Sequence, residues 1–132
     1  NIVINISRSA PLQPHANLTH YNCDILTDDL PELEAVDTLI YCPGSINLKP
    51  ISRLKLDDFR EDFEINVIGA IKFIQKYLPK LKHGVHPSVL LFSTVAAKLG
   101  MPYHASVAAA KSAVEGLTKS LGAELAPIIR VH

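Results

Sequence analysis

Residues 93–125 constrain the fold of this chain more than any other stretch. They follow a short apolar run, residues 89–92, which is typical of a buried strand. They then become a long alanine-rich segment whose apolar residues recur at helical spacing. Those residues are Val107, Ala110, Val114, Leu117 and Leu121. A strand that ends in Ser93-Thr94 and leads through a Gly/Pro loop into such a helix presents polar groups at the ligand edge of an α/β fold.

The rest of the chain alternates between predicted strands and predicted helices. Strands are predicted at residues 1–7, 18–22, 37–42, 89–92 and 128–131. Helices are predicted at residues 27–34, 56–81 and 105–126, and Pro79 is expected to tighten or end the second. This alternation predicts an α/β fold with a doubly wound parallel sheet, and we expect residues 1–132 to form a single domain.

Bulk composition excludes several classes of protein. Thirteen basic and thirteen acidic residues cancel, which argues against a nucleic-acid partner. No apolar run approaches the roughly 20 residues that span a membrane. Six scattered histidines and two cysteines show no metal-ligand spacing. Cys23 and Cys42, each in or beside a predicted strand, are predicted to be buried thiols, which fits a reducing cytoplasm.

A resemblance to a known family rests on Ser93-Thr94, Lys111 and the run K-S-A-V-E-G-L-T-K-S-L that begins at Lys111. These residues resemble the short-chain dehydrogenase/reductase family, whose pattern is a serine, a tyrosine thirteen residues later and a lysine four residues after that. Counting back from Lys111 places Val107 at the tyrosine position and Thr94 at the serine position. Ser93 is a neighbouring hydroxyl, and Tyr103 lies one helical turn before Val107.

The resemblance implies a Rossmann-type sheet whose central first strand and glycine-rich loop precede the residues seen here. The sequence contains no G-x-x-x-G-x-G. We therefore expect this chain to be part of a longer polypeptide, lacking the first glycine-rich strand–helix unit and the C-terminal part. We also expect the strands at residues 1–7 and 37–42 not to be neighbours.

The resemblance also implies cofactor-binding residues, each with a plainer alternative. Arg8 would bind the 2′-phosphate of NADP, or be a solvated surface arginine. Asp24 would contact the adenine amino group, or cap a turn, or do both. Residues 41–44, Y-C-P-G, occupy the place of the family's N-N-A-G motif, where glycine lets the main chain approach the cofactor. Gly44 is retained, Cys42 and Pro43 depart from the motif, and the alternative is an ordinary turn.

Two further residues match the family inside predicted helices. Asn66 would bend its helix and hold a water of the proton relay, or be a satisfied buried amide. Lys111 would hold the nicotinamide ribose, or be a surface lysine. In the family this lysine also lowers the pKa of the tyrosine.

The implied function is NADP(H)-linked interconversion of a small carbonyl compound and its alcohol, with NAD(H) less favoured. Thr94 or Ser93 would hold the substrate oxygen, and water or Tyr103 would supply the proton. Because Val107 has no proton to give, the alternative is a non-catalytic nucleotide-binding or scaffold protein of the same fold. Family dimers and tetramers imply a homo-oligomer through residues 56–81 and 105–126, where Phe59, Phe73, Leu117 and Leu121 add apolar surface.

Overall fold

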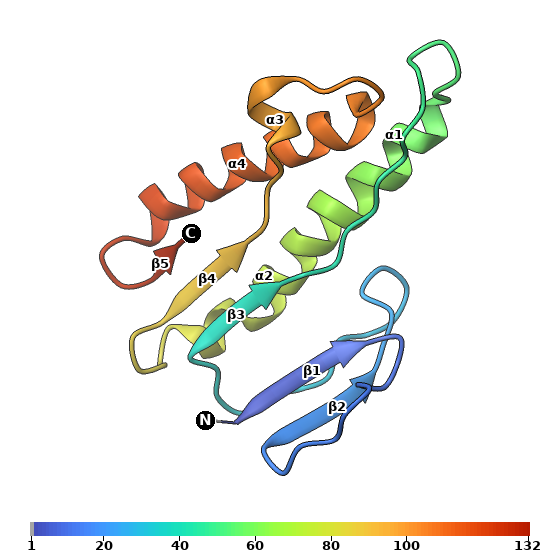
Figure 1. Ribbon diagram of the computed structural model, residues 1–132. Helices are drawn as coiled ribbons and strands as arrows, with labels where there is room; N and C mark the ends of the chain where they lie inside the picture. Colours follow the sequence, from blue (N-terminus) through green and yellow to red (C-terminus); the bar gives the residue numbers. More distant parts are fainter. Residues whose placement is uncertain (1) are drawn as a thin grey trace. The chain divides into compact units, whose positions relative to one another are not determined.

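The computed structural model describes residues 2–132, which divide into two compact units with the boundary between Glu32 and Leu33. The first unit holds β1 (Val3–Ser7) and β2 (Leu18–Asn22) (Figure 1). The two strands pair in parallel, with Val3 opposite Leu18 and Ser7 opposite Asn22. Their carboxyl ends therefore lie side by side, and each is followed by polar residues.

The second unit is built on a three-stranded parallel sheet in the order β3-β4-β5 (Figure 1). The strands are β3 (Thr38–Tyr41), β4 (Ser88–Leu91) and β5 (Arg130–Val131). Parallel neighbours need a crossover, and here both crossovers are helical. The first contains α1 (Leu56–Phe63), η1 (Glu64–Ile68) and α2 (Gly69–Leu81), and the second contains α3 (Ala96–Leu99) and α4 (Ala105–Leu125).

The helix predicted over residues 56–81 is continuous but not uniform. Asp57 and Asp58 occupy its first turn, and the Asp58 carboxylate accepts a hydrogen bond from the Lys55 main-chain nitrogen at 2.8 Å. Its middle, η1, is a π-helical turn, a form that occurs mostly as a single wide turn at functional sites. The Tyr41 hydroxyl on β3 donates to the Ile65 carbonyl at 2.6 Å and ties this turn to the sheet.

The core of the second unit lies between the sheet and its helices. Leu39 and Tyr41 on β3, and Val89 and Leu91 on β4, are the buried alternate residues of their strands. The buried helix residues facing them include Ala70, Ile74, Tyr77, Leu81, Ala110 and Val114. The centroid of the Phe73 ring lies 5.8 Å from that of the Tyr41 ring and 5.3 Å from that of the Tyr77 ring. Phe73 is half-buried, so this group of three aromatic rings lies at the edge of the core.

The predicted helix at residues 27–34 is wrong: a turn at residues 25–27 ends there, and the rest of the segment has no regular structure. The reason is competition from local side chains. The Asp24 carboxylate accepts from the Leu26 main-chain nitrogen at 2.9 Å, and the Asp28 carboxylate accepts from the Asp24 nitrogen at 2.8 Å. Pro31, which has no N–H to donate, also falls within the predicted helix.

Other sequence predictions need smaller corrections. The strand and helix ends shift by one or two residues, and α3 falls in a segment expected to be loop. Pro79 lies inside α2, which continues to Leu81. Cys23 is buried as predicted, but Cys42 is exposed; neither forms a disulfide.

The parallel pairing itself is confirmed, although the strands form two sheets rather than one. β1 pairs with β2 in the first unit, and β3 pairs with β4 in the second. No helix among residues 2–132 has the length and apolarity needed to cross a membrane.

Candidate nucleotide-binding and active site

The site residues of the second unit gather where β3 and β4 end. Because the two strands are parallel, their carboxyl ends meet at one edge of the sheet, and ligands of open α/β sheets bind at that edge. β3 leads into Cys42, Pro43 and Gly44, and β4 leads into Ser93 and Thr94. Cys42 and Gly44 are exposed there and Pro43 is half-buried, so this turn presents main chain rather than bulky side chains.

Gly44, Asn66 and Lys111 are brought together from three different elements. A Cβ atom added to Gly44 would lie 2.9 Å from Asn66 Oδ1 and 3.7 Å from Lys111 Nζ. The first distance is shorter than a carbon–oxygen contact allows, so only glycine fits without moving Asn66. The π-helical turn, the loop after β3 and α4 therefore bring these three residues together.

Asn66 is held rigidly by one end of its amide. Its Nδ2 donates to the Asp62 carbonyl at 2.8 Å and to the Ser45 carbonyl at 3.3 Å, and the residue is 1% exposed. Its Oδ1 is buried without a hydrogen-bond partner among the described residues. Buried polar atoms are nearly always paired, so this oxygen marks a place for a donor such as water or a ligand hydroxyl.

Asp62 is a site residue that the sequence reasoning missed. It is fully buried, and its Oδ1 accepts from the Ser45 hydroxyl at 2.6 Å and from Asn47 Nδ2 at 3.2 Å. Its Oδ2 has no partner among the described residues. The carboxylate thereby fixes the loop after β3 against the helix that carries Asn66. The available signal was its position four residues before Asn66, which puts both side chains on one helix face.

Lys111 lies half-buried on α4, and burial lowers the pKa of its ammonium group. Within residues 2–132 no carboxylate lies within ion-pair distance of it. Its ammonium is therefore a donor that has given up some hydration without gaining a charged partner in the protein. Such a group is suited to hold an incoming ligand oxygen.

The two hydroxyls after β4 have different surroundings. Ser93 Oγ donates to Glu115 Oε1 of α4 at 2.7 Å, so its proton is already engaged. Thr94 Oγ1 accepts from the Ala96 main-chain nitrogen at 3.3 Å, where α3 begins. Accepting that bond leaves the Thr94 hydroxyl proton available to donate. Of the two, Thr94 is the better placed to bind a substrate oxygen.

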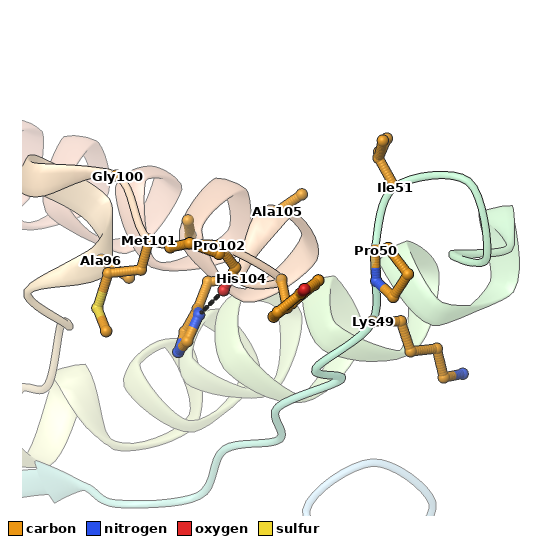
Figure 2. Close-up of a pocket in the computed structure, with 11 residues that line it drawn as sticks. Lys49, Pro50, Ile51, Ala96, Gly100, Met101, Pro102, His104 and Ala105 are labelled. Atoms are coloured by element: carbon orange, nitrogen blue, oxygen red, sulfur yellow. Dashed lines mark hydrogen bonds between the residues drawn. The ribbon is translucent and has the colours of Figure 1, made fainter.

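A cavity of about 440 Å³ opens between the loop before α1 and the segment that joins α3 to α4, and Figure 2 shows the residues that line it. Its mostly apolar lining includes Pro50, Ala96, Met101, Tyr103, His104 and Ala108. Val107 does not line it and is only 4% exposed, so its side chain packs inside the unit. Tyr103 lines it but is 59% exposed, which fits a residue at the cavity rim.

Arg8 and Asp24 come together within the first unit. They follow β1 and β2, and Arg8 Nη1 lies 3.8 Å from Asp24 Oδ2. Asp24 also caps a turn through its bond to the Leu26 nitrogen, so the plainer alternative holds for it. The Arg8 side chain is 79% exposed, and such a surface ion pair contributes little stability. Its guanidinium therefore remains accessible to an anion.

Comparison with known proteins decides the family. The family model described as short chain dehydrogenase matches residues 23–132. The chain belongs to the short-chain dehydrogenase family. Members of this family bind a nicotinamide cofactor, and residues 2–132 contain no cluster of His, Cys, Asp and Glu that could hold a metal ion.

Three relatives show how far this short-chain dehydrogenase resembles known members. The chain is 34% identical to the 17-beta-hydroxysteroid dehydrogenase type 1 of Mus musculus, over 74% of this chain and 28% of that protein. It matches the ligand-free aldohexose dehydrogenase of Thermoplasma acidophilum at a TM-score of 0.84 and 21% identity, over 98% of this chain and 54% of the other.

A short chain dehydrogenase of Shigella flexneri complexed with NADP matches at a TM-score of 0.79 and 21% identity, over 87% of this chain and 53% of that one. The two structural matches confirm the Rossmann-type α/β fold with parallel strands. The chain spans between about a quarter and a half of the length of these three relatives.

Proposed function

We propose that this protein is an NADP(H)-dependent oxidoreductase that interconverts a small carbonyl compound and its alcohol. The observation that carries the proposal is the convergence of Gly44, Asn66 and Lys111 at the carboxyl end of the sheet. The unpartnered Asn66 oxygen and the absence of a side chain at Gly44 both fit a bound nicotinamide ribose. NADPH, when bound, supplies a hydride.

The site residues take the following roles in this proposal. Lys111 donates to the ribose hydroxyls through its partly desolvated ammonium. Thr94 donates its hydroxyl proton to the substrate oxygen, and Ser93 supports it by its bond to Glu115. Asn66 holds a water through Oδ1, while Cys42 and Pro43 position the Gly44 main chain. Asp24 contacts the adenine, and Tyr103 lies at the rim.

Cofactor choice rests on Arg8 in this proposal. Its exposed guanidinium after β1 is suited to a phosphate monoester, because it can donate two parallel hydrogen bonds. Replacing Arg8 with aspartate should weaken NADPH binding by about 10- to 100-fold, since a hydrogen bond to a charged group contributes about 1.5–3 kcal/mol. The measurement is NADPH and NADH affinity by fluorescence titration of the full-length protein.

Arg8→Gln is the matched control for that experiment. It removes the positive charge without placing a second carboxylate near Asp24, so it should weaken NADPH binding and leave NADH binding nearly unchanged. Equal affinity of the parent protein for the two cofactors would contradict the assignment of Arg8.

We also propose a homodimer or homotetramer through residues 56–81 and 105–126. The side chains first expected to be exposed, Phe59, Phe73, Leu117 and Leu121, are half-buried. The exposed apolar side chains of the first helix are instead Leu56, Phe63 and Ile68. Light scattering of the full-length protein at micromolar concentration should give at least twice the monomer mass, and Phe63→Glu should reduce it. A monomeric parent would contradict the proposal.

Residues 1–132 are further proposed to belong to one nucleotide-binding domain of a cytoplasmic protein. The absence of a disulfide between Cys23 and Cys42 is consistent with that compartment.

The proposed oxidoreductase function is tested by following NADPH oxidation by the full-length protein against a panel of small aliphatic and cyclic ketones. Turnover of at least one ketone supports it, and failure to bind either nicotinamide cofactor overturns it.

A further inference from the structure

The proposed reaction lacks a proton donor at Val107, and the structure offers another at His104. His104 is the residue immediately before α4, and its carbonyl accepts from the Ala108 main-chain nitrogen at 2.8 Å. Its imidazole lines the 440 Å³ cavity, whereas Val107 does not. Imidazole is the side chain that most often donates or accepts protons near neutral pH.

The hydrogen bond of His104 determines which ring nitrogen is available. Nδ1 lies 2.7 Å from the Pro102 carbonyl oxygen, and a carbonyl can only accept, so Nδ1 carries a proton. Figure 2 shows this bond and shows the far end of the ring pointing away from it, on the same side as Met101. Nε2 is therefore the ring nitrogen left to gain or release a proton.

Helix geometry places His104 beside the missing tyrosine. His104, Ala108 and Lys111 are spaced four and three residues apart, which puts them on one face of α4. Side chains of a helix lean toward its N-terminus, so a tyrosine at position 107 would direct its ring toward the turn where His104 lies. A phenol at position 107 and the His104 imidazole would therefore lie on neighbouring turns at the start of α4.

We infer that His104 is the general acid of ketone reduction in this protein; this inference rests on the proposed function. As the carbonyl carbon takes the hydride, the carbonyl oxygen takes the Nε2 proton of the imidazolium and becomes the alcohol. NADP⁺ and neutral imidazole remain, and water returns the proton to Nε2. In alcohol oxidation neutral Nε2 accepts the hydroxyl proton.

The test is His104→Asn in the full-length protein, with NADPH and a ketone that the parent reduces. Asparagine can keep the Nδ1-type bond to the Pro102 carbonyl and is a favoured N-cap residue, so folding should be preserved. We expect kcat to fall by about 10²–10⁴-fold while NADPH affinity changes less than about twofold. The matched control, His83→Asn, makes the same replacement at an exposed histidine that does not line the cavity, and it should keep kcat within about threefold of the parent.

A second variant and a second readout make the outcome decisive. His104→Asn combined with Val107→Tyr should recover activity, because the phenol replaces the lost acid. In ¹⁵N-histidine spectra, adding ketone to the NADP⁺-bound parent should shift the His104 Nε2 resonance and leave that of Nδ1 nearly unchanged.

The contradicting outcomes separate this inference from the proposed function. Parent-like kcat in His104→Asn overturns the inference alone, as does an inactive Tyr103→Phe beside an active His104→Asn. A parent that binds NADPH but reduces no ketone also overturns it, since no proton is then transferred. A parent that binds neither cofactor overturns the proposed function itself.

Discussion

Ketone reduction by the Val107→Tyr variant should be about 10 to 10⁴ times faster than by the parent protein, with NADPH affinity nearly unchanged. The reason is general acid catalysis by a phenol four residues before Lys111, whose ammonium favours the ionised phenol. The gain should be smallest where His104 already supplies a proton and largest in the His104→Asn background. The measurement is NADPH oxidation by parent and variant side by side.

The buried position of Val107 requires a folding control for this variant. Inserting a ring at a site that is 4% exposed costs about 1–3 kcal/mol if the surroundings cannot adjust. Val107→Phe carries nearly the same bulk without the hydroxyl, so it should match Val107→Tyr in thermal stability and show no gain in activity. A well-folded Val107→Tyr that binds NADPH but gains no activity, even in the His104→Asn background, would mean that position 107 faces away from the nicotinamide.

Much of the fold follows from local sequence patterns. The four longer strands are short β-branched or apolar runs with polar or Gly/Pro ends, and the alanine-rich spacing after Tyr103 predicts α4 within one residue. The lack of a helix at residues 27–34 was missed because an Asp-rich segment can cap either a helix or a turn. The hydrogen bonds of the Asp24 and Asp28 carboxylates favour the turn at residues 25–27.

Part of the site was also predictable, but from the family resemblance rather than from local sequence patterns. The family resemblance identified Gly44, Asn66 and Lys111, and in the structure the side chains of Asn66 and Lys111 both lie beside Gly44. Asp62 and His104 were missed because their roles depend on partners distant in sequence or on a cavity. Asp62 binds Ser45 and Asn47 across the turn after β3, and the cavity beside His104 is closed by the loop before α1. No spacing rule within one helix reveals such contacts.

Replacing Lys111 with methionine should weaken NADPH binding by at least tenfold without destabilising the protein. The loss follows from charge-assisted hydrogen bonds to the ribose, each contributing about 1.5–3 kcal/mol. The unchanged stability follows from the pKa of Lys111, which burial lowers in the folded state. Keeping a lysine charged in the folded state costs stability when its pKa is lowered. That cost is present below the folded-state pKa and disappears as the pH rises toward 10.5, the ordinary pKa of a lysine. Methionine keeps the shape and removes this cost.

The central claim is that Gly44, Asn66 and Lys111 form a binding site for the nicotinamide ribose. One titration tests it most directly. NADPH binding and thermal unfolding are measured for the full-length parent, for Lys111→Met and for Lys119→Met, which alters an exposed lysine of the same helix. We predict saturable binding by the parent and by Lys119→Met, at least tenfold weaker binding by Lys111→Met, and unfolding midpoints for both variants at or above that of the parent. Equal NADPH affinity in all three proteins, or a Lys111→Met variant that loses stability rather than affinity, would contradict the account.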